Sequence, residues 1–407
     1  MPMNNLAIET NKLTDLVALR TLVASGYLTV GSKAHFKDQL IGKRNGQTYG
    51  FVLKDAGIAT NSLDASSDTK TSLTEQIVNL SLEPWHIYLK SNAVEGVTDV
   101  RWDDEIAKPN GAKLANGMVR DAINKNFTKA AVSIVGEGFQ PLAEAAAHLS
   151  SQTSEKLFGF TDPKIQAVLT ANGQQFNPVG SPDSFYKQGL LGEFHSVEYR
   201  AQRFFPSIKV DATLAGKIAT TTAALSITEA GVATVTLASG ATAAEMAGLP
   251  VMIPGVYACD INGDPTNNLF SFIVPMDATG SSFTVDGIFA MKGGTMTICD
   301  STGDEVGTVS GTAPNRTWAL SATAIEPIAA GTYFIAQVRA DGAFEFETLD
   351  KLDVSNADSK VGSVEGVTVH ENRVIDLEKM LNGTRWDIVA LYGTVEKRAV
   401  VNCYFKG

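Results

Sequence analysis

The sequence has few of the residues on which cross-linked or metal-dependent folds rely. Its 407 residues include three cysteines and five histidines. Cys259, Cys299 and Cys403 are an odd number and lie far apart, which excludes a disulfide framework, so we expect buried, reduced thiols. No two histidines stand at metal-ligand spacing; they are His35, His86, His148, His195 and His370.

Charge and long apolar runs are also scarce. Charged residues make up 19% of the chain and the formal net charge is -11, which argues against sequence-independent phosphate binding, because that affinity comes from Lys and Arg. No run of 18 or more apolar residues occurs, and the start, MPMNNLAIETNKLTDL, lacks the features of a secretory signal. We therefore expect a globular protein of two or three domains that stays in the cytoplasm where it is made.

Motifs that carry catalysis or ion binding are absent. There is no GxxxxGK[ST] and no GxSxG, and Gly136-Glu-Gly138 lacks the third glycine of a dinucleotide loop. Asp260 opens a sequence similar to a calcium loop, but Pro265 and Ser271 stand where Gly and Glu are required. The sequence predicts a protein that is not an enzyme and has no cofactor.

Apolar spacing predicts helices over residues 11–23, 110–132 and 141–157, the last opening on Pro141 at a first helical position. The Pro109-Asn-Gly111 sequence predicts a break before the second of these helices. Further elements are expected in the following places: a buried strand at 165–169, a hairpin of strands 332–338 and 343–349, a short helix at 373–381, and two closing strands.

Two other stretches have a strand pattern. Residues 47–54 and 73–82 alternate apolar and polar side chains around a polar run, which predicts a long hairpin that needs a surface to lie on. An adjacent subunit or an edge of the chain's own sheet could supply that surface. From 209 to 325 only 14 of 117 residues are charged, about 12%, and strands predicted at 233–237, 269–274, 282–285 and 295–299 indicate an inserted antiparallel barrel or sandwich.

Short motifs follow one another in a recognisable order along most of the chain. They are YGFVL (49–53), QIVNLSLEPWHIY (76–88), FNP (176–178), FYK (185–187), LGEF (191–194), FPSI (205–208), GTRWDIVALYG (383–393) and RAVVNCYF (398–405). On these motifs the chain resembles the coat proteins of short-tailed Salmonella-type phages. In that family an inserted β-domain begins just after the FPSI-like motif.

The resemblance implies an α+β fold of the Hong Kong (Johnson) capsid type with an inserted small antiparallel β-barrel or sandwich. The expected parts are an N-terminal arm (1–45), the extended-loop hairpin and following strands (46–92), a peripheral domain with the long helix (93–134), the axial domain's first half (135–208), the inserted β-domain (209–325), and the axial domain's second half with the C-terminal peripheral strands (326–407). The arm would lie on a neighbouring subunit, although the residues alone fit a packed terminal helix equally well. The closing strands would form a pair.

The function implied is that of a major capsid protein, found in the virion, that self-assembles as hexamers and pentamers into an icosahedral shell around double-stranded DNA. The resemblance also implies a portal and a scaffolding protein, and it leaves room for a decoration protein. Because the chain opens directly at the arm, we expect the scaffolding protein to be a separate chain. No membrane partner is expected.

Candidate contacts between subunits follow from charge. Basic residues of the predicted long helix, Lys113, Arg120 and Lys125, could pair with the polar hairpin tip of a neighbour; the tip carries Asp64, Asp68 and Lys70. A solvated helix face is the alternative. Two other functions stay open: the shell of a cellular nanocompartment, and a β-rich surface adhesin or fibre.

Overall fold

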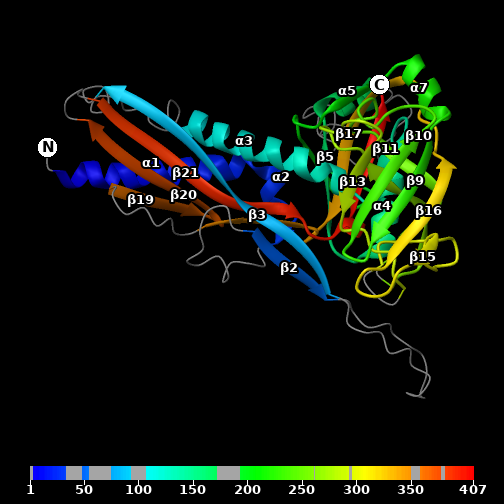
Figure 1. Cartoon of the computed structure of the whole chain (residues 1–407). Coiled ribbons are helices and arrows are strands. Elements are labelled where there is room, and N and C mark those ends of the chain that lie inside the picture. Colours follow the sequence, from blue (N-terminus) through cyan, green and yellow to red (C-terminus); the bar gives the residue numbers. More distant parts are fainter. Residues whose placement is uncertain are drawn as a thin grey trace. The chain divides into compact units, whose positions relative to one another are not determined.

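The computed structural model describes residues 3–33, 48–54, 75–92, 107–171, 193–260, 262–292, 296–349, 358–376 and 381–407. Within these ranges the protein is mixed α+β, with four sheets and few helices. The chain forms two compact units (Figure 1). Unit 1 comprises Met1–Tyr49, Asn79–Ile123 and Phe344–Gly393, and unit 2 comprises Gly50–Val78, Asn124–Ala343 and Thr394–Gly407.

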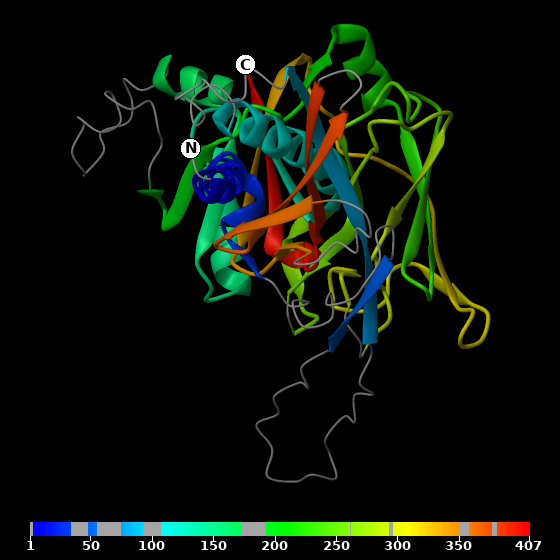
Figure 2. The same cartoon turned by 90° about the vertical axis from the view of Figure 1, so that its left-hand side faces the viewer.

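The sheet of unit 1 is built around one long strand, β21 (Leu381–Thr394). The order across it is β1 (Ser32–Lys33), β18 (Phe344–Thr348), β21, β20 (Val367–Asp376) and β19 (Asp358–Val364). On its other side β21 pairs with β3 (Glu75–Asn92) from Leu82 to Asn92 (Figure 2). β3 also pairs with β2 (Thr48–Lys54), so the strands predicted at 47–54 and 73–82 are confirmed.

Helix α1 (Met3–Ala24) packs on β19 and β20 (Figure 1). Val17 and Ala18 are fully buried, and the buried Thr14 hydroxyl donates a 2.5 Å hydrogen bond to Glu371 Oε2. The helix predicted at 11–23 is confirmed. Residues 14–24 pack their buried face on the chain's own sheet, and contact of this helix with a neighbouring subunit stays a prediction.

Helix α3 (Lys108–Asn126) is followed by a 3₁₀ turn, η3 (Phe127–Lys129). The helix predicted from 110 begins two residues earlier, at Lys108, and is helical through Pro109-Asn-Gly111; the residues before 107 lie outside the described part of the chain, so the predicted break before this helix stays a prediction. Pro109 lies in the first turn, where its missing N–H costs no intrahelical bond. Gly111 lies against α1, and a Cβ there would stand 2.8 Å from Arg20 Cβ and 2.9 Å from Val17 O. Glycine therefore lets the two helices approach closely.

The central sheet of unit 2 receives strands from both ends of the unit. Its order is β4 (Val132–Gly136), β22 (Val400–Lys406), β17 (Gly331–Ala340), β5 (Leu157–Thr161), β7 (Val197–Ala201) and β6 (Glu193–Phe194). β22 is covered on both faces: Cys403 Sγ donates to Pro141 O of α4 (Gln140–Gln152), and Tyr404 Oη donates to Gly248 O. Burial on both faces explains the unbroken apolar run of this strand.

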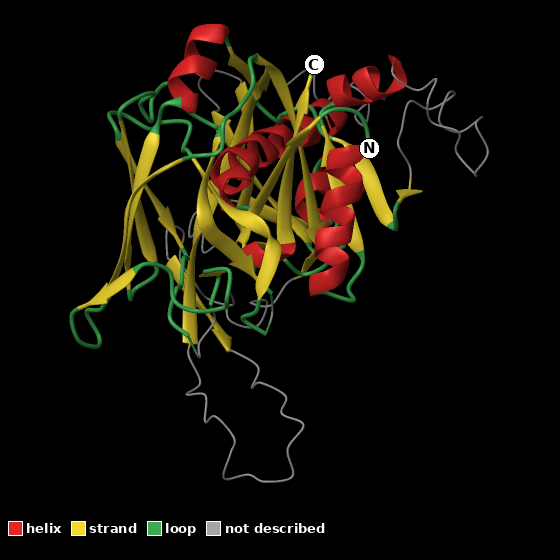
Figure 3. Ribbon diagram, turned by 90° about the vertical axis from the view of Figure 1, so that its right-hand side faces the viewer, coloured by secondary structure: helices red, strands yellow, loops and turns green. Residues whose placement is uncertain are grey.

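The chain leaves this sheet and returns to it at one place. β8 (Ser207–Val210) pairs with β17, and Val210 is opposite Gly331. Between them the 211–330 segment holds the short helix α7 (Ala212–Ala219) and is otherwise drawn as strands and loops (Figure 3).

The 211–330 segment contains two antiparallel sheets, which fits a sandwich better than a closed barrel. One has the order β13 (Ser282–Asp286), β10 (Val232–Ala238), β9 (Thr222–Thr228), β16 (Thr317–Ala324) and β15 (Thr308–Ser310). The other has the order β12 (Pro265–Ile273), β11 (Pro250–Cys259) and β14 (Ile298–Cys299). The strands predicted at 233–237, 269–274 and 282–285 are confirmed as β10, β12 and β13, and the strand predicted at 295–299 is confirmed at 298–299, as β14. The cross-strand row Phe283, Val235, Leu225 and Leu320 shows why alternating residues are apolar.

Two predicted elements have a different secondary structure. Residues 165–169 belong to helix α5 (Pro163–Ala171), because Asp162 Oδ1 accepts from Lys164 N at the helix start and Pro163 follows it. Of the helix predicted at 373–381, residues 373–376 are instead the end of β20 and Leu381 begins β21, with Asp376 opposite Leu381; residues 377–380 lie outside the described part of the chain. Cross-strand pairing overrides local helix preference there.

The predicted hairpin of 332–338 with 343–349 does not form either. β17 already has β22 on one side and β5 with β8 on the other, so β18 has no free edge of β17 to pair with and joins the sheet of unit 1. The two closing strands are likewise not a pair: β21 belongs to one sheet and β22 to the other.

Candidate functional site

The histidines with described hydrogen bonds have structural roles. His148 of α4 is buried, and its ring nitrogens lie 2.8 Å from Gln152 Nε2 and 2.8 Å from Asn268 Nδ2. Burial lowers the pKa of His148 to about 4. His370 Nε2 lies 3.0 Å from Leu349 O. Across the described ranges, no three His, Cys, Asp or Glu side chains are grouped so as to hold a metal ion.

Two acidic turns repeat the same geometry 40 positions apart in the chain. Asp260 Oδ1 accepts from the backbone N–H groups of Asn262 and Asp264, at 2.8 and 2.9 Å. Asp300 Oδ1 accepts from those of Thr302 and Asp304 at the same two distances. The first carboxylate of each turn therefore accepts hydrogen bonds from the backbone of its own turn. The hydrogen bond from the Thr302 hydroxyl, followed by that from Asp304 N, lowers the pKa of Asp300.

All three cysteines are buried and unpaired, so the burial predicted for them is confirmed. Cys259 and Cys299 share a small apolar cluster with Met296. Cys403 lies under α4, and burial raises the pKa of its thiol.

The predicted contact residues of the long helix are all exposed on α3. Lys113 and Arg120 are seven positions apart, which places them on one face two turns apart. Lys125 lies further round the helix. Asp64, Asp68 and Lys70, their predicted partners on a neighbour, lie outside the described residues. The pairing therefore stays a prediction.

Unit 1 also exposes large apolar side chains. Leu19 and Val23, four positions apart on the outer side of α1, are 37% and 70% exposed. Tyr88 of β3 and Val361 of β19 are about half exposed. Exposed apolar residues at helical spacing are typical of a surface that a partner covers.

Sequence reasoning missed two buried lysines in unit 2. Lys397 lies in the 3₁₀ turn η5 (Lys397–Ala399) and donates to Asp286 O. Burial, with a smaller contribution from the charge of Lys129, lowers the pKa of Lys397 to about 7. Burial also lowers the pKa of Lys129. The Glu-Lys-Arg run at 396–398 gives no sign of this, because such a run is typical of an exposed turn.

No helix in the described part of the chain combines the length and hydropathy needed to cross a membrane. No family model matches the chain, and neither does any curated protein.

Several solved structures resemble it over nearly its whole length. The capsid of the cyanophage P-SCSP1u is 9% identical, with 90% of this chain and 85% of that chain covered and a TM-score of 0.43. The acid-stable capsid of the Helicobacter pylori bacteriophage KHP30 is 7% identical, with 93% and 88% covered and a TM-score of 0.41. A virus-like particle from Pyrococcus furiosus is 8% identical, with 96% and 97% covered and a TM-score of 0.38. Identities and scores of this size report a likeness and establish no shared family.

Proposed function

We propose that this chain is a major capsid protein whose copies assemble into an icosahedral head shell around phage double-stranded DNA. The observation that carries the proposal is the pairing of Val210 with Gly331. The chain leaves a sheet at the end of β8 and re-enters it beside the same strand, as a domain inserted into a sheet must. In the coat family that the sequence resembles, a β-domain is inserted just after the motif found here at 205–208.

Two features of the described elements support a role in assembly. β2 pairs with β3 alone among the described strands, and a two-stranded ribbon is marginal in water unless it packs on something. In the proposed shell a neighbouring subunit supplies that packing. Leu19 and Val23 on the outer side of α1 offer a second contact. Contacts that are weak singly become strong when each subunit makes several.

The partners follow from the same proposal. The shell encloses DNA without binding it specifically, in keeping with the net charge of -11. A separate scaffolding protein guides assembly, which takes place in the host cytoplasm, and a portal occupies one vertex. The division of the chain into arm, extended loop, peripheral, axial and inserted parts belongs to the proposal too.

Assembly is tested by producing the chain alone and together with the products of its neighbouring genes, followed by sizing and negative-stain electron microscopy. Closed shells or polyheads are expected. A monomer under every condition would overturn the proposal and favour the adhesin alternative. Shells that contain enzymes and no nuclease-protected DNA would instead identify a nanocompartment.

Charge reversal tests the contact proposed for α3. Arg120→Glu should reduce the yield of closed shells severalfold, because a basic side chain that faces a neighbour's acidic tip becomes repulsive. Lys108→Glu is the matched control: it makes the same charge change on the same helix but on a different face. Equal yields from the two variants would rule out this contact.

A further inference from the structure

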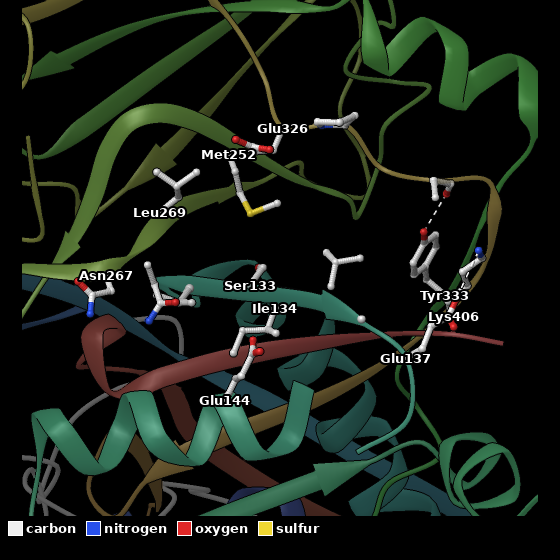
Figure 4. A pocket seen from close by; sticks show the side chains of 16 residues that line it. Ser133, Ile134, Glu137, Glu144, Met252, Asn267, Leu269, Glu326, Tyr333 and Lys406 are labelled. Atoms are coloured by element: carbon white, nitrogen blue, oxygen red, sulfur yellow. Dashed lines mark hydrogen bonds and ion pairs between the residues drawn. The ribbon is translucent and has the colours of Figure 1, made fainter. Parts of the chain in front are cut away.

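A groove of about 520 Å³ runs along β4 in unit 2 (Figure 4). All of β4, from Val132 to Gly136, lines one side of it. Met252 of β11 and residues 267–269 of β12 line the other side, and Glu326 lies above them (Figure 4). The groove therefore separates the central sheet of unit 2 from the smaller sheet of the 211–330 segment.

Both strands that border the groove are edge strands. Among the strands that the structure describes, β4 pairs with β22 alone and β12 pairs with β11 alone. At one end the two edges are joined, since Ser271 N donates to Ala131 O at 3.0 Å and Ser133 Oγ donates to Ser271 Oγ at 2.9 Å. Beyond this join, no main-chain hydrogen bond from the described residues reaches the second edge of β4 between Val132 and Gly136.

An edge strand offers a row of main-chain donors and acceptors to an added strand. Alternate peptide groups of β4 point away from β22, toward the side that the groove occupies. β4 spans roughly 16 Å at about 3.3 Å per residue. Val132, Ser133 and Ile134 are buried, whereas Val135 and Gly136 are partly exposed, so an added segment enters at the Val135–Gly136 end of β4. Met252, Leu269 and Tyr333 give apolar surface for some of its side chains.

The charge of the groove limits what that segment can be. Three carboxylates line it, Glu137, Glu144 and Glu326, against one cation, Lys406. Lys406 Nζ lies 3.5 Å from Glu137 Oε1, and Glu144 Oε1 accepts from the neutral amide of Gln140 at 2.7 Å. No cation of the described chain lies within ion-pair distance of Glu144 or Glu326.

We infer that the groove along β4 is a docking site for an extended segment of a partner protein that adds as a strand to β4 and carries basic side chains toward Glu144 and Glu326. Main-chain pairing supplies affinity, and the carboxylates select basic over acidic segments. The site needs one folded chain only, so it stands whether or not the chain forms shells.

The probe is a fluorescein-labelled peptide, TVKVTKVT, that alternates β-branched and basic residues, titrated into the purified full-length chain and followed by anisotropy. We expect saturable binding, and none by the acidic counterpart TVEVTEVT. The double variant Glu144→Gln with Glu326→Gln should weaken binding by about tenfold, because two charge-assisted contacts are lost. Glu155→Gln, which removes an exposed carboxylate of unit 2 outside the groove, should leave binding unchanged.

Amide hydrogen exchange separates strand addition from a purely ionic contact. Bound TVKVTKVT should slow exchange within 132–136 relative to the free chain, whereas spermidine at equal positive charge should not. Three results would each overturn the inference: no binding of TVKVTKVT, equal binding by the double variant and Glu155→Gln, or binding without protection of β4.

Discussion

The two ends of the chain are held in place by different means. The N-terminal helix α1 is packed by close approach: a Cβ on Gly111 of α3 or on Gly362 of β19 would come within 3 Å of its backbone. The C-terminal segment of unit 2 is held by side-chain hydrogen bonds to other elements. Asn402 Nδ2 of β22, for example, donates to Phe127 O of η3 at 2.6 Å. Added side-chain volume should therefore disturb the N-terminal helix, whereas loss of a hydrogen-bonding side chain should disturb the C-terminal segment.

The largest loss of stability is expected when a buried hydrogen-bonding side chain of the C-terminal segment is removed. Asn402→Ala should lower the free energy of unfolding by about 3 kcal/mol, because Phe127 O and Gln337 Nε2 lose their buried partner. Urea unfolding followed by tryptophan fluorescence measures this. Asn262→Ala, in an exposed turn, is the control and should change stability by less than about 0.5 kcal/mol. Equal losses in the two variants would mean that the buried bonds contribute nothing.

The second largest change in stability is expected where α3 packs closely against α1. Gly111→Ala should destabilise by about 2 kcal/mol, because overpacking against α1 outweighs the better helix propensity of alanine. Gly26→Ala in the short helix α2 (Gly26–Thr29) has nothing within 4 Å of the new Cβ, and it should stabilise by up to about 1 kcal/mol. The same urea experiment serves both variants. If both stabilise, α1 and α3 are free to move apart.

The smallest effect at neutral pH, and the one that depends on pH, comes from Lys397. Its folded pKa of about 7 is below the unfolded value, so the unfolded chain binds more protons between about pH 7 and 10, and the stability contribution of Lys397 rises with pH over that window. Replacement by methionine removes this rise. The stability of the natural chain relative to Lys397→Met should therefore increase by up to about 1 kcal/mol per pH unit.

Urea unfolding at several pH values between 7 and 10 measures this difference. Lys209→Met, which replaces an exposed lysine of β8, should follow the natural chain across the same range. A difference between the natural chain and Lys397→Met that does not change with pH would show that Lys397 stays charged in the folded protein.

Local patterns predicted the elements whose partners are close in the sequence. The alternation in β2 and β3, which pair with each other, and Pro141 at the start of α4 needed no distant information. Local patterns gave wrong predictions where pairing with a strand distant in the sequence determines the secondary structure or the sheet. β18 pairs with β21 and not with its neighbour β17, and residues 373–376 form the end of a strand because β21 lies beside them.

The site residues divide in the same way. Helical spacing alone places Lys113 and Arg120 on one face of α3. The groove brings together Glu137, Glu144 and Glu326, and Glu326 stands far along the chain from the other two. Residues so far apart in the sequence are brought together by the tertiary structure, and no local sequence pattern indicates it. The burial of Lys397 could not be predicted from its local sequence for a similar reason, because the residues around it belong to the distant elements η3 and β13.

The position of β22 between β4 and β17 means that this sheet cannot be completed until late in synthesis of the chain. β4 ends at Gly136 and pairs with a strand that begins at Val400, so its partner is made roughly 13–50 s later at ordinary translation rates. Until β22 emerges from the ribosome, a nascent chain therefore leaves β4 without its partner strand and one edge of β17 open, although β17 can already pair with β5 and β8. Loss of β22 by early termination would leave β4 unpaired and one edge of β17 open in the middle of the sheet, which makes synthesis of β22 the step that completes this sheet.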